Sequence, residues 1–125
     1  MKVFLVNDSA IVLEKLAAMI SGIDGVEIAG QALNEHDAIQ SIVKLKPDVV
    51  ILDIRLNGGG SGMNVLKRIK KEMPPPIVIM LTNYPFPQYR EKCQALGADY
   101  FFDKVTEIEK IYDMFQQLQK DKSGT

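Results

Sequence analysis

The sequence predicts a single α/β domain built on a parallel β-sheet with helices on both faces. Short apolar segments rich in β-forming residues alternate along the chain with segments whose apolar residues recur at helical spacing. Residues 48–52 and 77–81 are apolar on both faces, which is typical of strands buried between two layers of helices. A chain of 125 residues hides about two-thirds of its unfolded surface on folding, which is enough for a core.

The expected elements follow one another strictly as strand and helix. The apolar strand segments occupy residues 3–6, 26–32, 48–52, 77–81 and 100–102. The apolar stripes of the helices run over residues 11–20, 38–45, 63–69, 89–96 and 108–118. Right-handed crossovers restrict such a chain to a few wound topologies.

Residues with special capping or backbone properties stand at the ends of these segments. Asp8-Ser9 and Asn34 can cap the first two helices, because their side-chain oxygens accept hydrogen bonds from first-turn amides. Pro47 closes the second helix, Pro74–Pro76 close the third, and Gly97 stops the fourth. These signals support the element boundaries independently of the apolar pattern.

Composition excludes several classes of protein. Fifteen Lys and Arg residues against sixteen Asp and Glu residues leave a net charge of -1, which gives no bulk reason to bind nucleic acid or an anionic membrane. No apolar run approaches the ~18 residues that a membrane span needs. Cys93, the one cysteine, cannot form an internal disulfide and is expected in the core. We therefore expect a cytoplasmic protein.

Polar residues directly follow four of the five expected strands. The first strand ends at Asn7-Asp8, the third at Asp53, the fourth at Thr82-Asn83 and the fifth at Asp103-Lys104. Because helices connect consecutive parallel strands, these ends share one edge of the sheet, where open α/β sheets bind ligands. Two carboxylates, a hydroxyl and an ammonium group are therefore expected around one crevice.

This set of side chains is suited to phosphoryl transfer. Two nearby carboxylates repel each other, and Mg²⁺ relieves that repulsion. Lys104 offers a positive charge to a phosphoryl group, and the Thr82 hydroxyl can donate a hydrogen bond to it. Asp53 can be the nucleophile, since aspartyl phosphates are an established covalent intermediate. Each residue alone has a structural explanation as a cap, a turn or a surface charge, so the joint placement carries the prediction.

Taken together, these segments resemble the receiver domain of two-component response regulators, over roughly residues 1–118. The resemblance rests on Val6-Asn7-Asp8-Ser9, Val49–Asp53, Met80–Asn83, Phe101–Lys104, Gly25–Gly30 and Leu96–Tyr100. The family fold is a (βα)5 flavodoxin-like three-layer sandwich with strand order 2-1-3-4-5. We expect a receiver domain over residues 1–120 and a frayed tail over residues 121–125.

The resemblance implies a phosphoryl-accepting site that uses Mg²⁺. Asp53 would take the phosphoryl group from a sensor histidine kinase or a phosphotransfer protein. Asp8, Asp53 and the backbone carbonyl of Arg55 would ligate the metal, and Asn7 would reach it through a water held by its side-chain carbonyl. Asn7 stands where the family usually has a second acidic residue, so we expect weakened metal binding.

The resemblance also implies a switch. Thr82 and Lys104 would contact the phosphoryl group, and Phe101 would be the rotating aromatic switch residue. The output surface would be the fourth helix, fifth strand and fifth helix, which would bind a downstream protein effector or a second copy, without direct contact to nucleic acid or membrane. On this surface we expect Tyr89, Arg90, Lys92, Tyr100 and Lys110.

Further departures from the family pattern give specific expectations. Val105 follows Lys104 where the family usually has a cis-proline, so a trans bond is expected. Arg55 and Tyr84 are bulky at positions that control water access in the family, which predicts slow autodephosphorylation. The loop of residues 57–62 lacks P-loop spacing and is interpreted as a flexible turn. The basic residues between 67 and 71 are interpreted as a solvated helix face.

Three other functions compete with this prediction. A degenerate receiver would act as a phosphorylation-independent interaction domain, and it is the main alternative. A haloacid-dehalogenase-type phosphatase would need a second Asp where Arg55 stands. A flavodoxin-type cofactor binder would place its flavin phosphate against Asn7-Asp8, whose carboxylate would repel it. We therefore expect no enzyme in the metabolic sense, only slow self-phosphorylation and autodephosphorylation.

Overall fold

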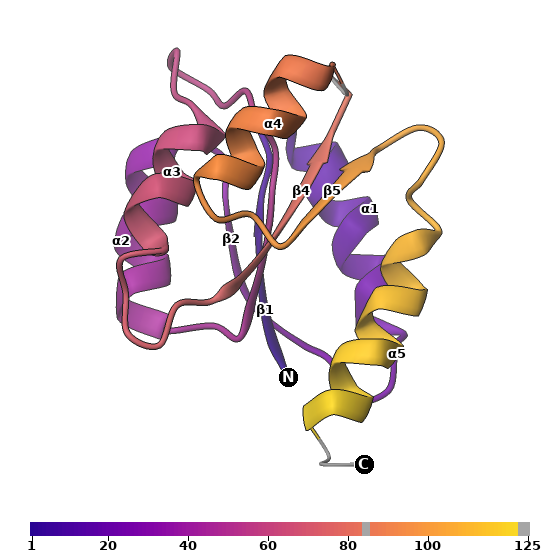
Figure 1. Ribbon diagram of the computed structural model, residues 1–125. Helices are drawn as coiled ribbons and strands as arrows, with labels where there is room; N and C mark the ends of the chain where they lie inside the picture. The colour runs from indigo at the N-terminus through magenta and orange to yellow at the C-terminus, as the bar shows by residue number, and fades with distance from the viewer. Residues whose placement is uncertain (84–85, 123–125) are drawn as a thin grey trace.

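The computed structural model describes residues 1–83 and 86–122 and confirms the predicted α/β fold (Figure 1). The strands in these ranges are β1 (Lys2–Val6), β2 (Glu27–Ala32), β3 (Val49–Leu52), β4 (Ile77–Thr82) and β5 (Tyr100–Asp103). The helices are α1 (Ala10–Ser21), α2 (Glu35–Leu45), α3 (Gly62–Ile69), α4 (Pro87–Ala95) and α5 (Lys110–Lys122). Among the helices of residues 1–83 and 86–122, none has the length and apolar character of a membrane-spanning segment.

The sheet has the order β2-β1-β3-β4-β5, and all its strand pairs are parallel. This is the order that the family resemblance implied. In the register, Val6 lies opposite Leu52. Asn7 and Asp53, which follow these two residues, therefore leave the sheet side by side at its carboxyl edge. This edge between β1 and β3 is the point where the strand order reverses and where such sheets bind ligands.

The strands feed two separate cores because successive side chains point to opposite faces of the sheet. On one face, Val50 and Leu52 pack in a cluster that includes buried residues of α2, α3 and α4. On the other face, Val49 and Ile51 pack with α1 and α5. Figure 1 shows the same division, with α1 and α5 on one side of the sheet. Burial on both faces explains why these strands read as continuous apolar runs.

The predicted caps are present. Ser9 Oγ accepts a hydrogen bond from the Val12 amide at 3.3 Å, and Asn34 Oδ1 accepts one from the Asp37 amide at 2.8 Å.

Helix α5 continues to Lys122, so two residues of the expected frayed tail are helical, and the rest of that tail lies outside the described residues. Cys93 is fully buried in the core as predicted, and burial raises the pKa of its thiol to about 11.

The interpretation of the basic cluster as a solvated helix face is wrong for Lys70. Helix α3 ends at Ile69, and the Lys70 ammonium lies 2.7 Å from Oδ2 of Asp99 and donates to the carbonyl of Pro76 at 2.8 Å. The same Asp99 oxygen accepts a hydrogen bond from the Val78 amide at 2.8 Å. Lys70 and Asp99 therefore tie the start of β4 to the turn before β5.

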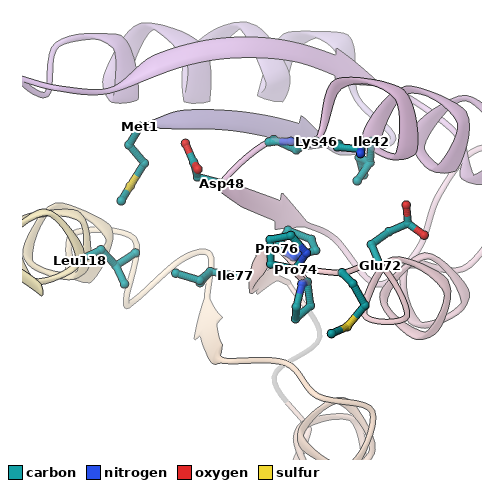
Figure 2. Close-up of a pocket in the computed structure, with 12 residues that line it drawn as sticks. Met1, Ile42, Lys46, Asp48, Glu72, Pro74, Pro76, Ile77 and Leu118 are labelled. Atoms are coloured by element: carbon teal, nitrogen blue, oxygen red, sulfur yellow. The ribbon is translucent and has the colours of Figure 1, made fainter. Parts of the chain in front are cut away.

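A cavity of about 530 Å³ lies at the amino ends of the strands (Figure 2). Met1, Asp48 and Ile77, which precede or begin β1, β3 and β4, line it together with the segment from Met73 to Pro76 and Leu118 of α5. Because the polar strand-end residues lie at the opposite edge of the sheet, this cavity is separate from the candidate site.

Candidate functional site

Asp53 is a buried carboxylate at the carboxyl edge of the sheet, and both of its oxygens have partners. The residue is only 5% exposed. Its Oδ1 accepts a hydrogen bond from the Ile54 amide at 2.7 Å. Its Oδ2 lies 3.1 Å from Nζ of Lys104 and accepts a second hydrogen bond from Nδ2 of Asn7 at 3.2 Å. A buried carboxylate is stabilised only when it is paired and hydrogen-bonded, and these donors supply both.

Asn7 is also buried, and both the nitrogen and the oxygen of its side-chain amide make hydrogen bonds. While Nδ2 donates to Asp53, Oδ1 accepts a hydrogen bond from the Ser9 amide at 3.0 Å. The side-chain carbonyl, which the sequence analysis expected to hold a metal-bound water, thus lies toward the start of α1. The backbone amide of Asp53 donates to the carbonyl of Val6 at 3.1 Å, which fixes the two strand ends against each other.

Lys104 is placed by the end of β4. Its backbone amide donates to the carbonyl of Thr82 at 2.9 Å, and Thr82 itself is fully buried. Thr82 and Asp103 face each other in the sheet register. The hydroxyl-bearing residue, the ammonium and the Asp53 carboxylate therefore come from three adjacent strands. Among the residues of the described ranges, the cis peptide bond is Met73–Pro74, so the Lys104–Val105 bond is trans as expected.

The oxygen donors at this edge are of the type that Mg²⁺ takes. Asp8 is exposed and follows the buried Asn7 at the end of β1, and Asp53 follows the neighbouring strand β3. The described residues contain no group of three or more His, Cys, Asp or Glu side chains that could hold a metal. Two carboxylates and a backbone carbonyl suit an ion that keeps several of its waters, as Mg²⁺ does. The donor set therefore fits the expected metal.

The glycine-rich loop after β3 turns at Gly58–Gly59, as expected, and contacts with other segments hold its last residues. Glu35 Oε1, at the start of α2, accepts hydrogen bonds from the Ser61 amide at 3.0 Å and from Nδ2 of Asn64 at 3.2 Å. The Gly62 amide donates to the carbonyl of Ile54 at 2.6 Å. A Cβ atom on Gly62 would collide with the backbone carbonyl of Asp53, so only glycine fits there. Sequence reasoning missed both constraints, since each depends on a contact between distant segments.

Phe101 is 5% exposed and belongs to the cluster under α2, α3 and α4. The guanidinium carbon of Arg90 lies 4.7 Å from the centre of its ring. On the expected output surface, Lys92 and Lys110 are exposed, whereas Tyr89, Arg90 and Tyr100 are half-buried. The Arg55 side chain is exposed, His36 lies on the surface, and Tyr84 lies outside the described residues.

Comparisons with known proteins identify the family of this chain. The model of the family described as response regulator receiver domain matches residues 3–116. The chain is 32% identical over 121 residues to the uncharacterized transcriptional regulatory protein YvfU of Bacillus subtilis (strain 168), covering 97% of this chain and 60% of that protein. The chain spans about half to three-fifths of the length of the curated relatives it matches.

Solved structures share the same fold. A DNA-binding response regulator of the LuxR family from Staphylococcus aureus superposes with a TM-score of 0.84 at 28% identity, over 93% of this chain and 96% of that one. The response regulatory domain of protein mrkE from Klebsiella pneumoniae gives a TM-score of 0.86 with complete coverage of both chains, at 22% identity. The second likeness concerns the fold alone.

Proposed function

This chain belongs to the response regulator receiver domain family. On that premise we propose that it accepts a phosphoryl group on Asp53 and that phosphorylation changes the surface formed by α4, β5 and α5. It is the receiver domain of a two-component response regulator. The observation that carries the proposal is the Asp53 carboxylate itself, which is buried at the switch point of the sheet and lies 3.1 Å from Lys104. We propose that the receiver domain occupies residues 1–120.

In the proposed reaction, an oxygen of Asp53 attacks the phosphorus of a phosphohistidine on a sensor kinase or phosphotransfer protein. The P–N bond breaks with its electron pair leaving on the imidazole nitrogen, which takes a proton from solvent. The Ile54 amide holds Oδ1 and so fixes the orientation of the carboxylate. Lys104 offsets the added negative charge, and the Thr82 hydroxyl donates to a phosphoryl oxygen.

Asp8, Asp53 and the backbone carbonyl of Arg55 would hold Mg²⁺, with Asn7 in reach through water. When bound, the ion supplies positive charge for the phosphoryl oxygens, in the manner usual for phosphoryl transfer. Asn7 contributes no charge, so the site has two carboxylates against one lysine. We therefore propose that the metal is bound more weakly than it would be by three carboxylates.

The added phosphoryl group brings about -1.5 to -2 charges, which is enough to bias a two-state segment near it. We propose that the segment is β5 with its flanking loops, and that Phe101 is the residue that changes position. The surface of α4, β5 and α5 would then bind a protein effector or a second copy. The support for this is the buried state of Phe101, only three residues before Lys104.

A direct test measures the intact mass of the protein after incubation with Mg²⁺ and acetyl phosphate. We expect one added phosphoryl group, absent both from Asp53→Asn and from a sample with the metal chelated. A wild-type protein that takes up no phosphoryl group, from acetyl phosphate or from a phosphohistidine donor, would overturn the proposal. It would favour the alternative, a receiver that binds partners without phosphorylation.

The lifetime of the phosphoryl group is a second part of the proposal. Arg55 and Tyr84 are bulky at the positions that we propose to control water access, so autodephosphorylation should be slow. Trimming both side chains to Ala should shorten the half-life of the phosphorylated protein. An unchanged half-life would refute the assignment. The chemistry proposed for this chain is thus limited to self-phosphorylation and autodephosphorylation, without metabolic catalysis.

A further inference from the structure

The segment that follows β3 leaves the sheet and folds into a small hairpin of residues 55–61. Arg55 and Ser61, at its two ends, pair as an antiparallel bridge. Gly58–Gly59 form its tip, with φ angles of 73° and 77°. Positive φ at both central positions is typical of the tight turns that close β-hairpins. The backbone carbonyl of Arg55, a proposed metal ligand, therefore belongs to this 55–61 hairpin and not to the sheet.

Glu35, the first residue of α2, attaches the 55–61 hairpin to that helix. Its Oε1 accepts hydrogen bonds from the Ser61 amide at 3.0 Å and from Nδ2 of Asn64 at 3.2 Å. Gly60 packs directly against it, because a Cβ atom on Gly60 would lie 3.0 Å from Cβ of Glu35. One carboxylate oxygen thus holds the returning arm of the hairpin and the first turn of α3 at the start of α2.

The bridge between the two arms carries this contact to Arg55. Ile54 and Asn57, on either side of Arg55, have backbone hydrogen bonds of their own, to the first residue of α3 and to the loop before α2. Arg55 lies between them and pairs with Ser61, whose amide Glu35 holds. A displacement of Ser61 would therefore shift the backbone of Arg55.

The position of this backbone matters for the proposed metal. Mg²⁺ requires near-ideal octahedral geometry, with oxygen ligands at about 2.0–2.1 Å. A ligand on a loosely held loop must be ordered when the ion binds, and this ordering lowers the affinity, whereas a ligand that is already fixed avoids the cost. Groups that orient the ligands of a metal without touching it commonly change the affinity by about 10–100-fold when they are removed.

We propose that Glu35 is a positioning residue that sets the affinity of the site for Mg²⁺ by fixing the backbone of Arg55 through Ser61. This inference rests on the proposed function, because it names a residue that tunes the metal site of that function. In this role Glu35 orients a ligand and does not bind the ion. Its carboxylate acts as a hydrogen-bond acceptor, so its negative charge is not what the metal site needs.

The test measures the dissociation constants of Mg²⁺ and Ca²⁺ by titration calorimetry of the unphosphorylated protein. Glu35→Ala removes the acceptor, whereas Glu35→Gln keeps an acceptor oxygen and loses only the charge. Glu91→Ala is the matched control, because it removes the same charge from an exposed position on α4. A second readout, taken without metal, is hydrogen exchange of the Leu56 amide, which donates to the carbonyl of Gly60 within the hairpin at 3.1 Å.

We expect Glu35→Ala to weaken Mg²⁺ binding by about tenfold. The Leu56 amide of this variant should exchange faster than that of the wild type. Ca²⁺ binding should weaken less, because Ca²⁺ accepts more flexible geometry and longer bonds to oxygen. Glu35→Gln and Glu91→Ala should bind both ions as the wild type does.

A folded Glu35→Ala protein with wild-type affinity for Mg²⁺ would overturn the proposal, even if its Leu56 amide exchanged faster, since the contact would then order the hairpin alone. Equal losses in Glu35→Ala and Glu35→Gln would also overturn it, because a loss of charge would explain them. So would a loss in Glu35→Ala that is the same for Mg²⁺ and Ca²⁺.

The same titrations separate this inference from the proposed function. A wild-type protein that binds no Mg²⁺ would overturn both the proposed metal site and the role of Glu35. A wild-type protein that binds Mg²⁺ no better than Glu35→Ala does would overturn the role of Glu35 alone. If Glu35→Ala loses Mg²⁺ affinity as expected but the wild type takes up no phosphoryl group, the role of Glu35 stands and the proposed function fails.

Discussion

Asn7 donates a hydrogen bond from its side-chain amide to Oδ2 of Asp53 across 3.2 Å, and both residues are buried. A carboxylate at position 7 would face Asp53 with like charge instead. The amide therefore donates to the Asp53 carboxylate where a second carboxylate would repel it, and Lys104 supplies the cation. An amide at position 7 also lacks the negative charge with which a carboxylate there would attract a divalent ion.

Replacement of Asn7 by Asp should lower the stability of the metal-free protein and raise its affinity for Mg²⁺. In a chelator, Asn7→Asp should unfold at a temperature several degrees lower, because loss of a hydrogen bond to a charged group costs about 1.5–3 kcal/mol. Addition of Mg²⁺ should raise the melting temperature of this variant more than that of the wild type. Differential scanning calorimetry with and without the ion measures both effects. A variant as stable as the wild type in the chelator would contradict this account of Asn7.

Gly62 is required by the close approach of α3 to the backbone of Asp53. Gly62→Ala should destabilise the protein by about 2 kcal/mol or more, since its Cβ would collide with the backbone carbonyl of Asp53 after β3. The matched control is Gly22→Ala after α1, where the nearest atom to an added Cβ is the Met19 carbonyl oxygen at 3.6 Å. Urea unfolding of both variants checks the prediction. A similar free energy of unfolding for the two variants would mean that α3 can move away from the Asp53 backbone at little cost.

Glu35 should control the order of the loop that follows Asp53, the proposed phosphoacceptor. Glu35→Ala removes the acceptor of the Ser61 amide and of the Asn64 side chain. Hydrogen exchange of the Ser61 amide should accelerate by about tenfold, which corresponds to about 1.4 kcal/mol of local opening. Exchange in β3 should stay unchanged. If the Ser61 amide exchanges equally fast in both proteins, Glu35 does not hold the loop.

Cys93 should make the protein less stable at high pH. Burial raises the pKa of its thiol from 9.0 to about 11, so the unfolded chain loses the proton first as the pH rises. Stability should therefore fall between about pH 9 and pH 11, by on the order of 1–2 kcal/mol. Cys93→Ala should show a smaller decline over the same range, as measured by urea unfolding at each pH. Equal declines in the two proteins would exclude Cys93 as the cause.

Local sequence patterns predict most of the strands and helices of the fold. The strands were identified because Val49–Leu52 and Ile77–Leu81 are apolar on both faces, and the helix starts because Ser9 and Asn34 can cap them. Periodicity alone left several wound topologies open. The order 2-1-3-4-5 came from the family resemblance, and the structure confirms it.

The contacts within the site were less accessible from the sequence. The strand ends identified Asp53 and Lys104, but not that the Asn7 amide nitrogen faces Asp53, which depends on the register of Val6 against Leu52. The Glu35 contact to Ser61 joins residues 26 positions apart. Such a contact cannot be predicted from local sequence patterns, because it depends on how distant segments pack in the folded chain.

Chemical trapping locates the phosphoryl group on the protein directly. Borohydride reduces an acyl phosphate to an alcohol, so protein treated with Mg²⁺, acetyl phosphate and then borohydride carries a permanent mark at the phosphorylated residue. Peptide mass spectrometry should find this mark at Asp53 alone, and Asp53→Asn treated in the same way should carry none. A mark at another residue, or one that persists in Asp53→Asn, would contradict the assignment of Asp53 as the phosphoacceptor.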